Sequence, residues 1–123
     1  YRKKLYNGGK FWMSKRGIGF KYENLVKNFL LNKKLEYLES NYYSEYGEID
    51  LIFKENDTLI FVEVKYRKDD KYGLAEESVN RQKLKKIINT SLVYIAENEW
   101  TGEYRYDLVA VNGEEIIWFE NIV

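Results

Sequence analysis

Residues 47–67 constrain the fold of this chain most strongly, because they contain two runs of β-branched and aromatic residues. The runs span residues 48–54 and 58–66, and a short polar segment, Glu-Asn-Asp, separates them. Asn and Asp tolerate the positive φ of tight turns, so the segment is suited to connect two antiparallel strands. The stretch therefore predicts a β-hairpin.

The turn also predicts which residues of the hairpin face each other. If the hairpin closes through a two-residue turn, Asp50 lies opposite Glu63. In the same register, Glu48 lies opposite Lys65. Because side chains alternate between the two faces of a strand, all four charged side chains are expected on one face of the sheet.

This arrangement of charges has a cost and two interpretations. Like charges directly opposite each other destabilise a strand pair, and a carboxylate on a strand covered on both sides needs a partner. Carboxylates whose Cβ atoms are about 5 Å apart could share one cation, at about 2.1 Å for Mg²⁺. The alternative is a Glu48–Lys65 ion pair with Asp50 and Glu63 at a solvated edge, which contributes little stability.

The spacing of these charges matches a known motif. Asp50, a gap and then Glu63-Val64-Lys65 form the Asp…Glu-x-Lys signature of the PD-(D/E)xK nucleases. The wider pattern closely resembles the YraN-like family over residues 17–123, through residues 47–52 (GEIDLI), 61–67 (FVEVKYR), Lys83 and 105–107 (RYD). That family consists of small bacterial proteins with a restriction-endonuclease-like fold, similar to archaeal Holliday-junction resolvases.

The resemblance implies a divalent-metal-dependent endonuclease that hydrolyses DNA phosphodiester bonds, with branched or flapped DNA as the substrate class. Asp50, Glu63 and the carbonyl of Val64 would hold Mg²⁺ or Mn²⁺, and Glu23 would join them directly or through water. Lys65 would orient the attacking water or stabilise negative charge. Asp50, Glu63 and Lys65 are therefore the candidate catalytic residues.

Two further basic residues are candidates for contact with DNA. Arg67 belongs to a local basic cluster that follows the Glu-x-Lys strand, and Lys83 matches a lysine that recurs in the family pattern. Lysines near a helix N-terminus oppose the helix dipole, so the cluster of Lys83, Lys85 and Lys86 there indicates a phosphate contact, with a solvated face as the alternative for Lys85 and Lys86. For Glu23 the alternative is an acid near a helix N-terminus, which the helix dipole favours.

The remaining segments predict the other elements. Residues 17–34 and 80–97 have helical periodicity, and the first predicts an apolar stripe of Tyr22, Leu25, Val26, Phe29 and Leu30. The second predicts a buried stripe of Leu84, Ile87, Ile88, Leu92 and Ile95. Residues 35–43, 103–111 and 114–119 predict further strands. The order α-β-β-β-α-β-β predicts an α/β fold, a mixed sheet flanked by helices, as in a restriction-endonuclease-like core.

Composition narrows the chemistry of the chain. It has no cysteine and no histidine, which excludes disulfides, the common zinc sites and any histidine base. The sequence contains no run of about 18 apolar residues, the length that a membrane-spanning helix needs. We therefore expect no membrane partner and a cytoplasmic location. The sequence makes no prediction about the oligomeric state.

The zero net charge hides an asymmetry. Residues 1–21 contain seven of the twenty Lys and Arg residues and no acid. We expect residues 1–16 to be a basic N-terminal extension and residues 17–123 to be a single domain. Met13 is the only methionine, so residues 1–12 are expected to precede the native start.

The rest of the chain is acidic, which counts against strong nonspecific DNA binding. A noncatalytic nucleic-acid-binding or adaptor module that retains the nuclease fold is therefore the alternative function. A partner-binding domain that uses the aromatic content is a third.

Overall fold

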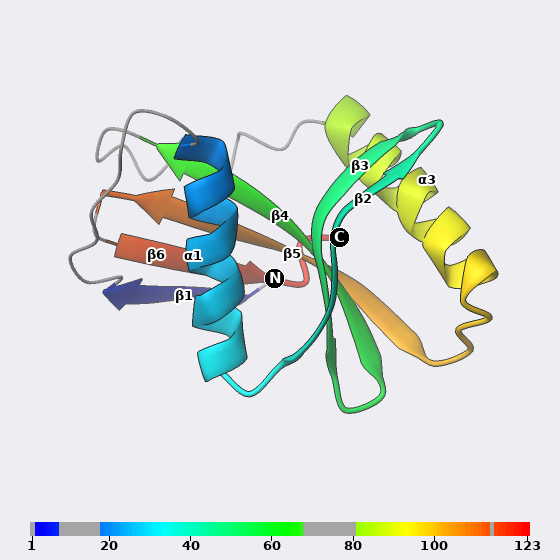
Figure 1. Ribbon diagram of the computed structural model, residues 1–123, viewed down its shortest axis with the longest axis horizontal. Coiled ribbons are helices and arrows are strands. Elements are labelled where there is room, and N and C mark those ends of the chain that lie inside the picture. The colour runs from blue at the N-terminus through cyan, green and yellow to red at the C-terminus, as the bar shows by residue number, and fades with distance from the viewer. Residues whose placement is uncertain (1, 8–17, 68–80, 114) are drawn as a thin grey trace.

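The computed structural model describes residues 2–7, 18–67, 81–113 and 115–123 (Figure 1). Within them the chain forms an α/β fold with one six-stranded mixed sheet and two helices. The elements are β1 (Arg2–Asn7), α1 (Ile18–Asn32), β2 (Glu36–Ser44), β3 (Gly47–Glu55), β4 (Thr58–Arg67), α3 (Arg81–Glu97), β5 (Glu103–Asn112) and β6 (Glu115–Glu120).

The strands lie in the order β1-β6-β5-β4-β3-β2. Strand β5 runs parallel to β4, and the other neighbours are antiparallel. A parallel pair needs a long crossover, and here α3 lies on the connection from β4 to β5. The α/β class with a mixed sheet is therefore confirmed.

Strand β1 was not predicted from the sequence. It pairs along its whole length with β6, from Arg2↔Glu120 to Asn7↔Glu115. Its two apolar residues, Leu5 and Tyr6, are consecutive, so the sequence shows no apolar alternation; Leu5 is exposed and Tyr6 packs on the core. An edge strand needs no regular apolar face, so the pattern gave no signal. Residues 8–16 of the expected extension lie outside the described residues.

Helix α1 covers one face of the sheet, as its predicted stripe requires (Figure 1). Tyr22, Val26 and Leu30 are buried among β-strand residues such as Leu51, Phe53, Ile60 and Val62. The ring of Tyr22 stacks on Tyr66 of β4 with 3.9 Å between centroids. This packing fixes the N-terminal half of α1 against the second half of β4.

Helix α3 packs on the other face, where the prediction is confirmed for Ile87, which is buried, and for Ile88 and Ile95, which pack partly buried against the core. Its buried residues are Ile87, Thr90, Ser91 and Tyr94, and Leu92 is 47% exposed. The prediction for Leu92 was wrong because the helix contacts β2 and β5 partly through the hydroxyl groups of Thr90 and Ser91. The Thr90 hydroxyl lies 2.8 Å from that of Ser44, and Ser91 bonds the hydroxyl of Tyr106.

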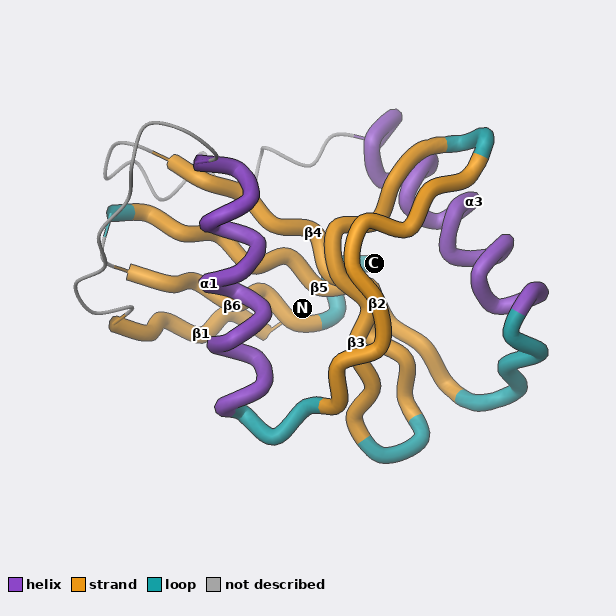
Figure 2. The backbone as a smooth tube through the Cα atoms, viewed as in Figure 1, coloured by secondary structure: helices purple, strands orange, loops and turns teal. Residues whose placement is uncertain are grey.

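The register of the β3–β4 hairpin is confirmed. The ladder begins at Glu55↔Thr58 and ends at Leu51↔Val62, and Asn56 in the turn has φ of 54°. Beyond this point β3 turns away with β2 toward α3, while β4 continues beside β5 (Figure 2). The sheet therefore forks at Asp50 and Glu63, which are the neighbours in sequence of the last paired residues, Leu51 and Val62.

The described helices, α1 and α3, include none that is long and apolar enough to cross a membrane.

Candidate metal centre at the fork of the sheet

The first feature of the fork is that a side chain replaces a backbone acceptor. The Oδ2 atom of Asp50 accepts a hydrogen bond of 2.8 Å from the backbone N–H of Val64. Backbone donors in a sheet need a partner when the neighbouring strand departs. The Asp50 carboxylate supplies that partner, and the contact holds the carboxylate between the two strands.

Asp50 and Glu63 come together at this point. The N–H that bonds Asp50 belongs to Val64, the residue next to Glu63, and Glu63 is only 7% exposed. Burial, followed by the negative charge of Glu63, raises the pKa of Asp50 to about 8, although the Val64 N–H acts in the opposite direction. Two carboxyl groups that approach so closely repel each other when both are ionised. The pair therefore favours either a shared proton or a cation.

Two lysines, Lys65 and Lys83, join Asp50 and Glu63, and we call these four residues the inner cluster. The ammonium group of Lys83, on α3, lies 3.0 Å from Oε1 of Glu63, and it also contacts Lys65. Burial first and Lys83 second lower the pKa of Lys65. For Lys83 burial also acts to lower the pKa, but its bonds to Lys65 and Glu63 outweigh this and raise it. The sequence predicted Lys83 as a DNA contact, and the structure adds its ion pair with Glu63.

A second group of residues borders the inner cluster on the side of α1. The Nδ2 atom of Asn41 donates hydrogen bonds of 2.8 Å to Glu23 and 2.8 Å to Glu48. Burial raises the pKa of Glu23, and the charges of Glu48 and Glu63 add to this while the Asn41 bond opposes it. Glu23 is thus close enough for the charge of Glu63 to affect its pKa. Its carboxylate is held by Asn41.

Asn41 was not among the site residues predicted from the sequence. Asn is depleted in strands, so its presence within β2 was an available signal. The residue has φ of 51° and follows a register shift between Tyr37 and Glu39. Such irregularities often re-aim a side chain beside a functional site.

The residues of the inner cluster fit a hard divalent cation by the chemistry of their donors. In the described ranges no three acidic side chains lie close enough to hold a metal ion by themselves. Asp50 and Glu63 supply two carboxylates, and Mg²⁺ is commonly bound by one or two carboxylates while it keeps several waters. All four predicted ligands, Asp50, Glu63, Glu23 and the Val64 carbonyl, stay predictions. Arg67 ends β4, and its side chain lies outside the described part.

The raised pKa of Asp50 predicts an unusual pH dependence for the metal-free protein. The folded state keeps this proton up to about pH 8, whereas the unfolded chain loses it near the ordinary aspartate pKa of 3.8. The contribution of Asp50 to the free energy of unfolding therefore falls as the pH rises between these values. In EDTA at pH 8, Asp50→Asn is expected to stabilise the protein by more than about 1 kcal/mol.

Urea unfolding of both proteins between pH 4 and pH 8 measures this difference. The stabilisation should shrink toward pH 4, where wild-type Asp50 is protonated in the folded state and increasingly so in the unfolded chain. Parallel pH profiles for the two proteins would show that Asp50 ionises normally.

A second polar cluster lies on the α1 face, around the first residues of β5. Asp107 is buried, and it accepts hydrogen bonds from Arg105, from Nε1 of Trp118 at 2.9 Å and from the N–H of Asn121 at 2.8 Å. Burial raises the pKa of Asp107, and these bonds oppose the rise. The structure thus pairs Asp107 with Arg105.

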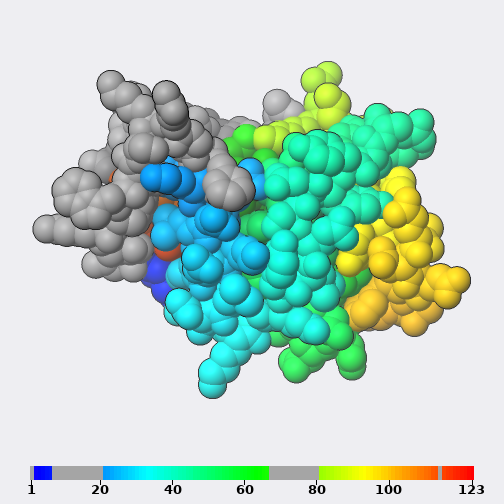
Figure 3. Space-filling view, in the orientation of Figure 1, coloured from blue at the N-terminus to red at the C-terminus, as the bar shows by residue number. Residues whose placement is uncertain are grey.

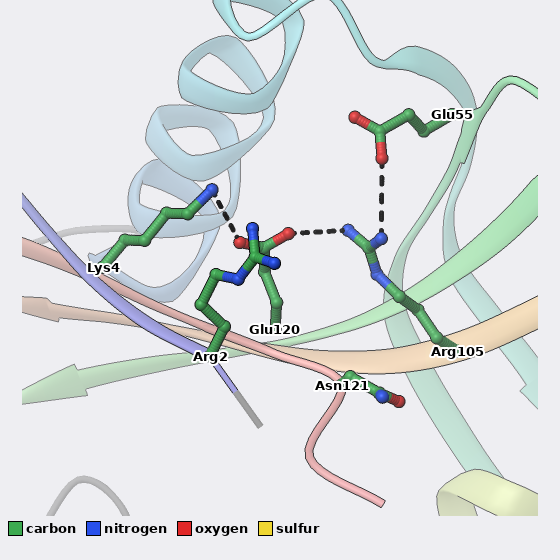
Figure 4. A pocket seen from close by; sticks show the side chains of 6 residues that line it. All are labelled: Arg2, Lys4, Glu55, Arg105, Glu120 and Asn121. Carbon is green, nitrogen blue, oxygen red and sulfur yellow. Dashed lines mark hydrogen bonds and ion pairs between the residues drawn. The ribbon is translucent and has the colours of Figure 1, made fainter.

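Arg105 extends this cluster to the surface. It also pairs with Glu55 at 3.5 Å and with Glu120 at 3.3 Å, and Lys4 bonds Glu120 at 2.8 Å (Figure 4). These residues line a cavity of about 590 Å³ together with Arg2 and Asn121. Acids and bases alternate around its wall, so the cluster ties β1, β3, β5 and β6 together.

The family profile and the relatives that this chain resembles all belong to one family. The profile of the family described as "Uncharacterised protein family UPF0102" matches residues 22–111. A UPF0102 protein of Vibrio parahaemolyticus is 43% identical over 114 residues, which cover 89% of this chain and 94% of that protein. A UPF0102 protein of Fusobacterium nucleatum is 38% identical over 112 residues, which cover 90% of this chain and 94% of that protein.

Proposed function

The chain belongs to the UPF0102 (YraN-like) family, and we propose that it is a divalent-metal-dependent endonuclease that hydrolyses DNA phosphodiester bonds. The observation that carries the proposal is the meeting of Asp50 and Glu63 at the fork, beside Lys65 and Lys83. The forked mixed sheet agrees with the restriction-endonuclease-like core that the sequence resembles.

The charge balance at the fork supports a cation there. Glu23, Glu48, Asp50 and Glu63 outnumber the two ammonium groups of Lys65 and Lys83 by two when all are ionised. Ionised carboxylates that are withdrawn from water need a compensating charge. Mg²⁺ or Mn²⁺ matches this excess, and Asp50 and Glu63 would hold it.

The chain's own residues would divide the work as follows. A bound divalent cation supplies the positive charge that polarises a phosphodiester and favours attack by water. The Val64 N–H keeps the Asp50 carboxylate in place between the strands. Lys65, whose lowered pKa brings it closer to neutral pH, would hold the attacking water or stabilise charge on the phosphate. Lys83 would orient Glu63 and Lys65.

An incision assay tests this proposal. Single-stranded, flapped, four-way-junction and continuous duplex DNA of one sequence would be incubated with Mg²⁺, Mn²⁺ or EDTA. Endonucleolytic products that require Mg²⁺ or Mn²⁺ on at least one substrate are expected. The absence of incision from every substrate in both metals would contradict the proposal.

One observation favours the alternative, a noncatalytic nucleic-acid-binding or adaptor module. The ion pair between Lys83 and Glu63 partly compensates the acidic cluster without any metal. Such a module would bind DNA with a strong salt dependence. Its binding would be unchanged by EDTA and by Glu63→Gln, which separates it from the endonuclease.

A further inference from the structure

One aromatic ring beside the fork, that of Tyr43, is largely exposed to solvent. Tyr43 of β2 is 68% exposed, the highest value among the large hydrophobic side chains that the structure describes as exposed. It pairs across the ribbon with Glu48. Strand β2 forms part of the surface on the face that carries α1 (Figure 3). The ring is therefore open to solvent beside Glu48.

The pKa of the Tyr43 hydroxyl is also affected by the acids at the fork. The charge of Glu48 is the main cause that raises the pKa of the Tyr43 hydroxyl, and the charges of Glu23 and Asp50 contribute. Its neighbour Tyr42 differs in role, because it packs edge-on against Tyr94 and bonds Glu97 of α3. Tyr43 thus faces the fork, whereas Tyr42 anchors β2 to the helix.

We propose that Tyr43 is a specificity-determining residue, on which an unpaired base next to the cleaved phosphodiester stacks. Both faces of a base inside a continuous duplex are covered by its neighbours, so only an unpaired base can offer a free face to the ring. The substrate class is then DNA with unpaired nucleotides, as in a single strand or a flap. This inference rests on the proposed endonuclease function.

Stacking suits this position for two physical reasons. The surrounding carboxylates repel phosphates unless a cation is bound, so binding at the fork gains from a contact that needs no charge. Stacking of a base on an aromatic side chain accepts every base. Tyr43 would position the strand without selecting its sequence.

Binding of fluorescent oligonucleotides by Tyr43→Ala, Tyr43→Phe and the wild type tests the inference, with Ca²⁺ in place of Mg²⁺ to prevent cleavage. Tyr43→Ala is expected to weaken binding of single-stranded DNA about ten-fold, in line with the loss of one stacked base. Binding of continuous duplex should change less than about two-fold, and Tyr43→Phe should behave like the wild type because it keeps the ring.

Tyr104→Ala is the matched control, since Tyr104 is also an exposed tyrosine but lies at the start of β5, where it pairs with Leu59. A 2-aminopurine at the unpaired position reports the stacking itself, and its quenching should be lost in Tyr43→Ala alone. If Tyr43→Ala binds single strands like the wild type, or if Tyr43→Phe loses as much as Tyr43→Ala, the inference is overturned while the endonuclease proposal stands. Failure of the wild type to bind any DNA overturns both.

Discussion

Glu63→Gln is expected to lower the rate of DNA incision at least about 1000-fold, because the variant loses one of the two carboxylates that would hold the cation. The amide keeps the shape of the side chain, so the fold should be retained. Initial rates of incision at saturating Mg²⁺ measure the loss.

Glu36→Gln is the matched control for this variant. Glu36 is an exposed acid on β2 that pairs with Lys54 at 3.4 Å, away from the fork. The control should incise DNA at the wild-type rate and unfold at the wild-type temperature. A folded Glu63→Gln protein that retains more than about a tenth of the wild-type rate would show that Glu63 is not part of the catalytic site.

The largest effect on stability is expected for Asp107→Ala. This change removes the shared acceptor for Arg105, Trp118 and Asn121, and it leaves buried donors without partners. Breaking a buried charged network in this way costs about 3 kcal/mol or more. For a domain of this size the melting temperature should fall by roughly 10 °C, as measured by calorimetry or circular dichroism.

Asp107→Asn separates the charge from the hydrogen bonds. The amide oxygen can still accept a bond from Trp118 or from the N–H of Asn121, so this variant should lose less stability than Asp107→Ala. Its remaining loss reflects the pairing with Arg105. Equal stability of Asp107→Ala and the wild type would show that Arg105 is satisfied by Glu55 and Glu120 alone.

Local rules explain why the register of the β3–β4 hairpin could be predicted from the sequence. A two-residue turn fixes the register of a hairpin, and alternation then fixes the face of each side chain. The sequence therefore predicted that Asp50 and Glu63 would share a face. It did not predict that the ladder stops before them, because the departure of β3 depends on its packing with β2 and α3.

The features that the sequence did not reveal depend on tertiary contacts. The ion pair between Lys83 and Glu63 joins residues twenty positions apart through the placement of α3. The buried face of α3 includes Thr90 and Ser91, which an apolar periodicity overlooks. Asn41 reaches both Glu23 and Glu48 only because of an irregular backbone in β2. None of these follows from the spacing of residues along the chain.

The unfolding temperature of EDTA-treated protein, titrated with Mn²⁺ at constant ionic strength, tests most directly whether the acids at the fork form a cation site. A ligand that binds only the folded state stabilises it, by about 2.7 kcal/mol at one hundred times its dissociation constant. We predict a saturable rise for the wild type and for Glu36→Gln, and none for the Asp50→Asn, Glu63→Gln double variant. A wild-type protein that Mn²⁺ leaves unchanged, or a double variant that responds equally, would contradict the assignment of a metal centre to Asp50 and Glu63.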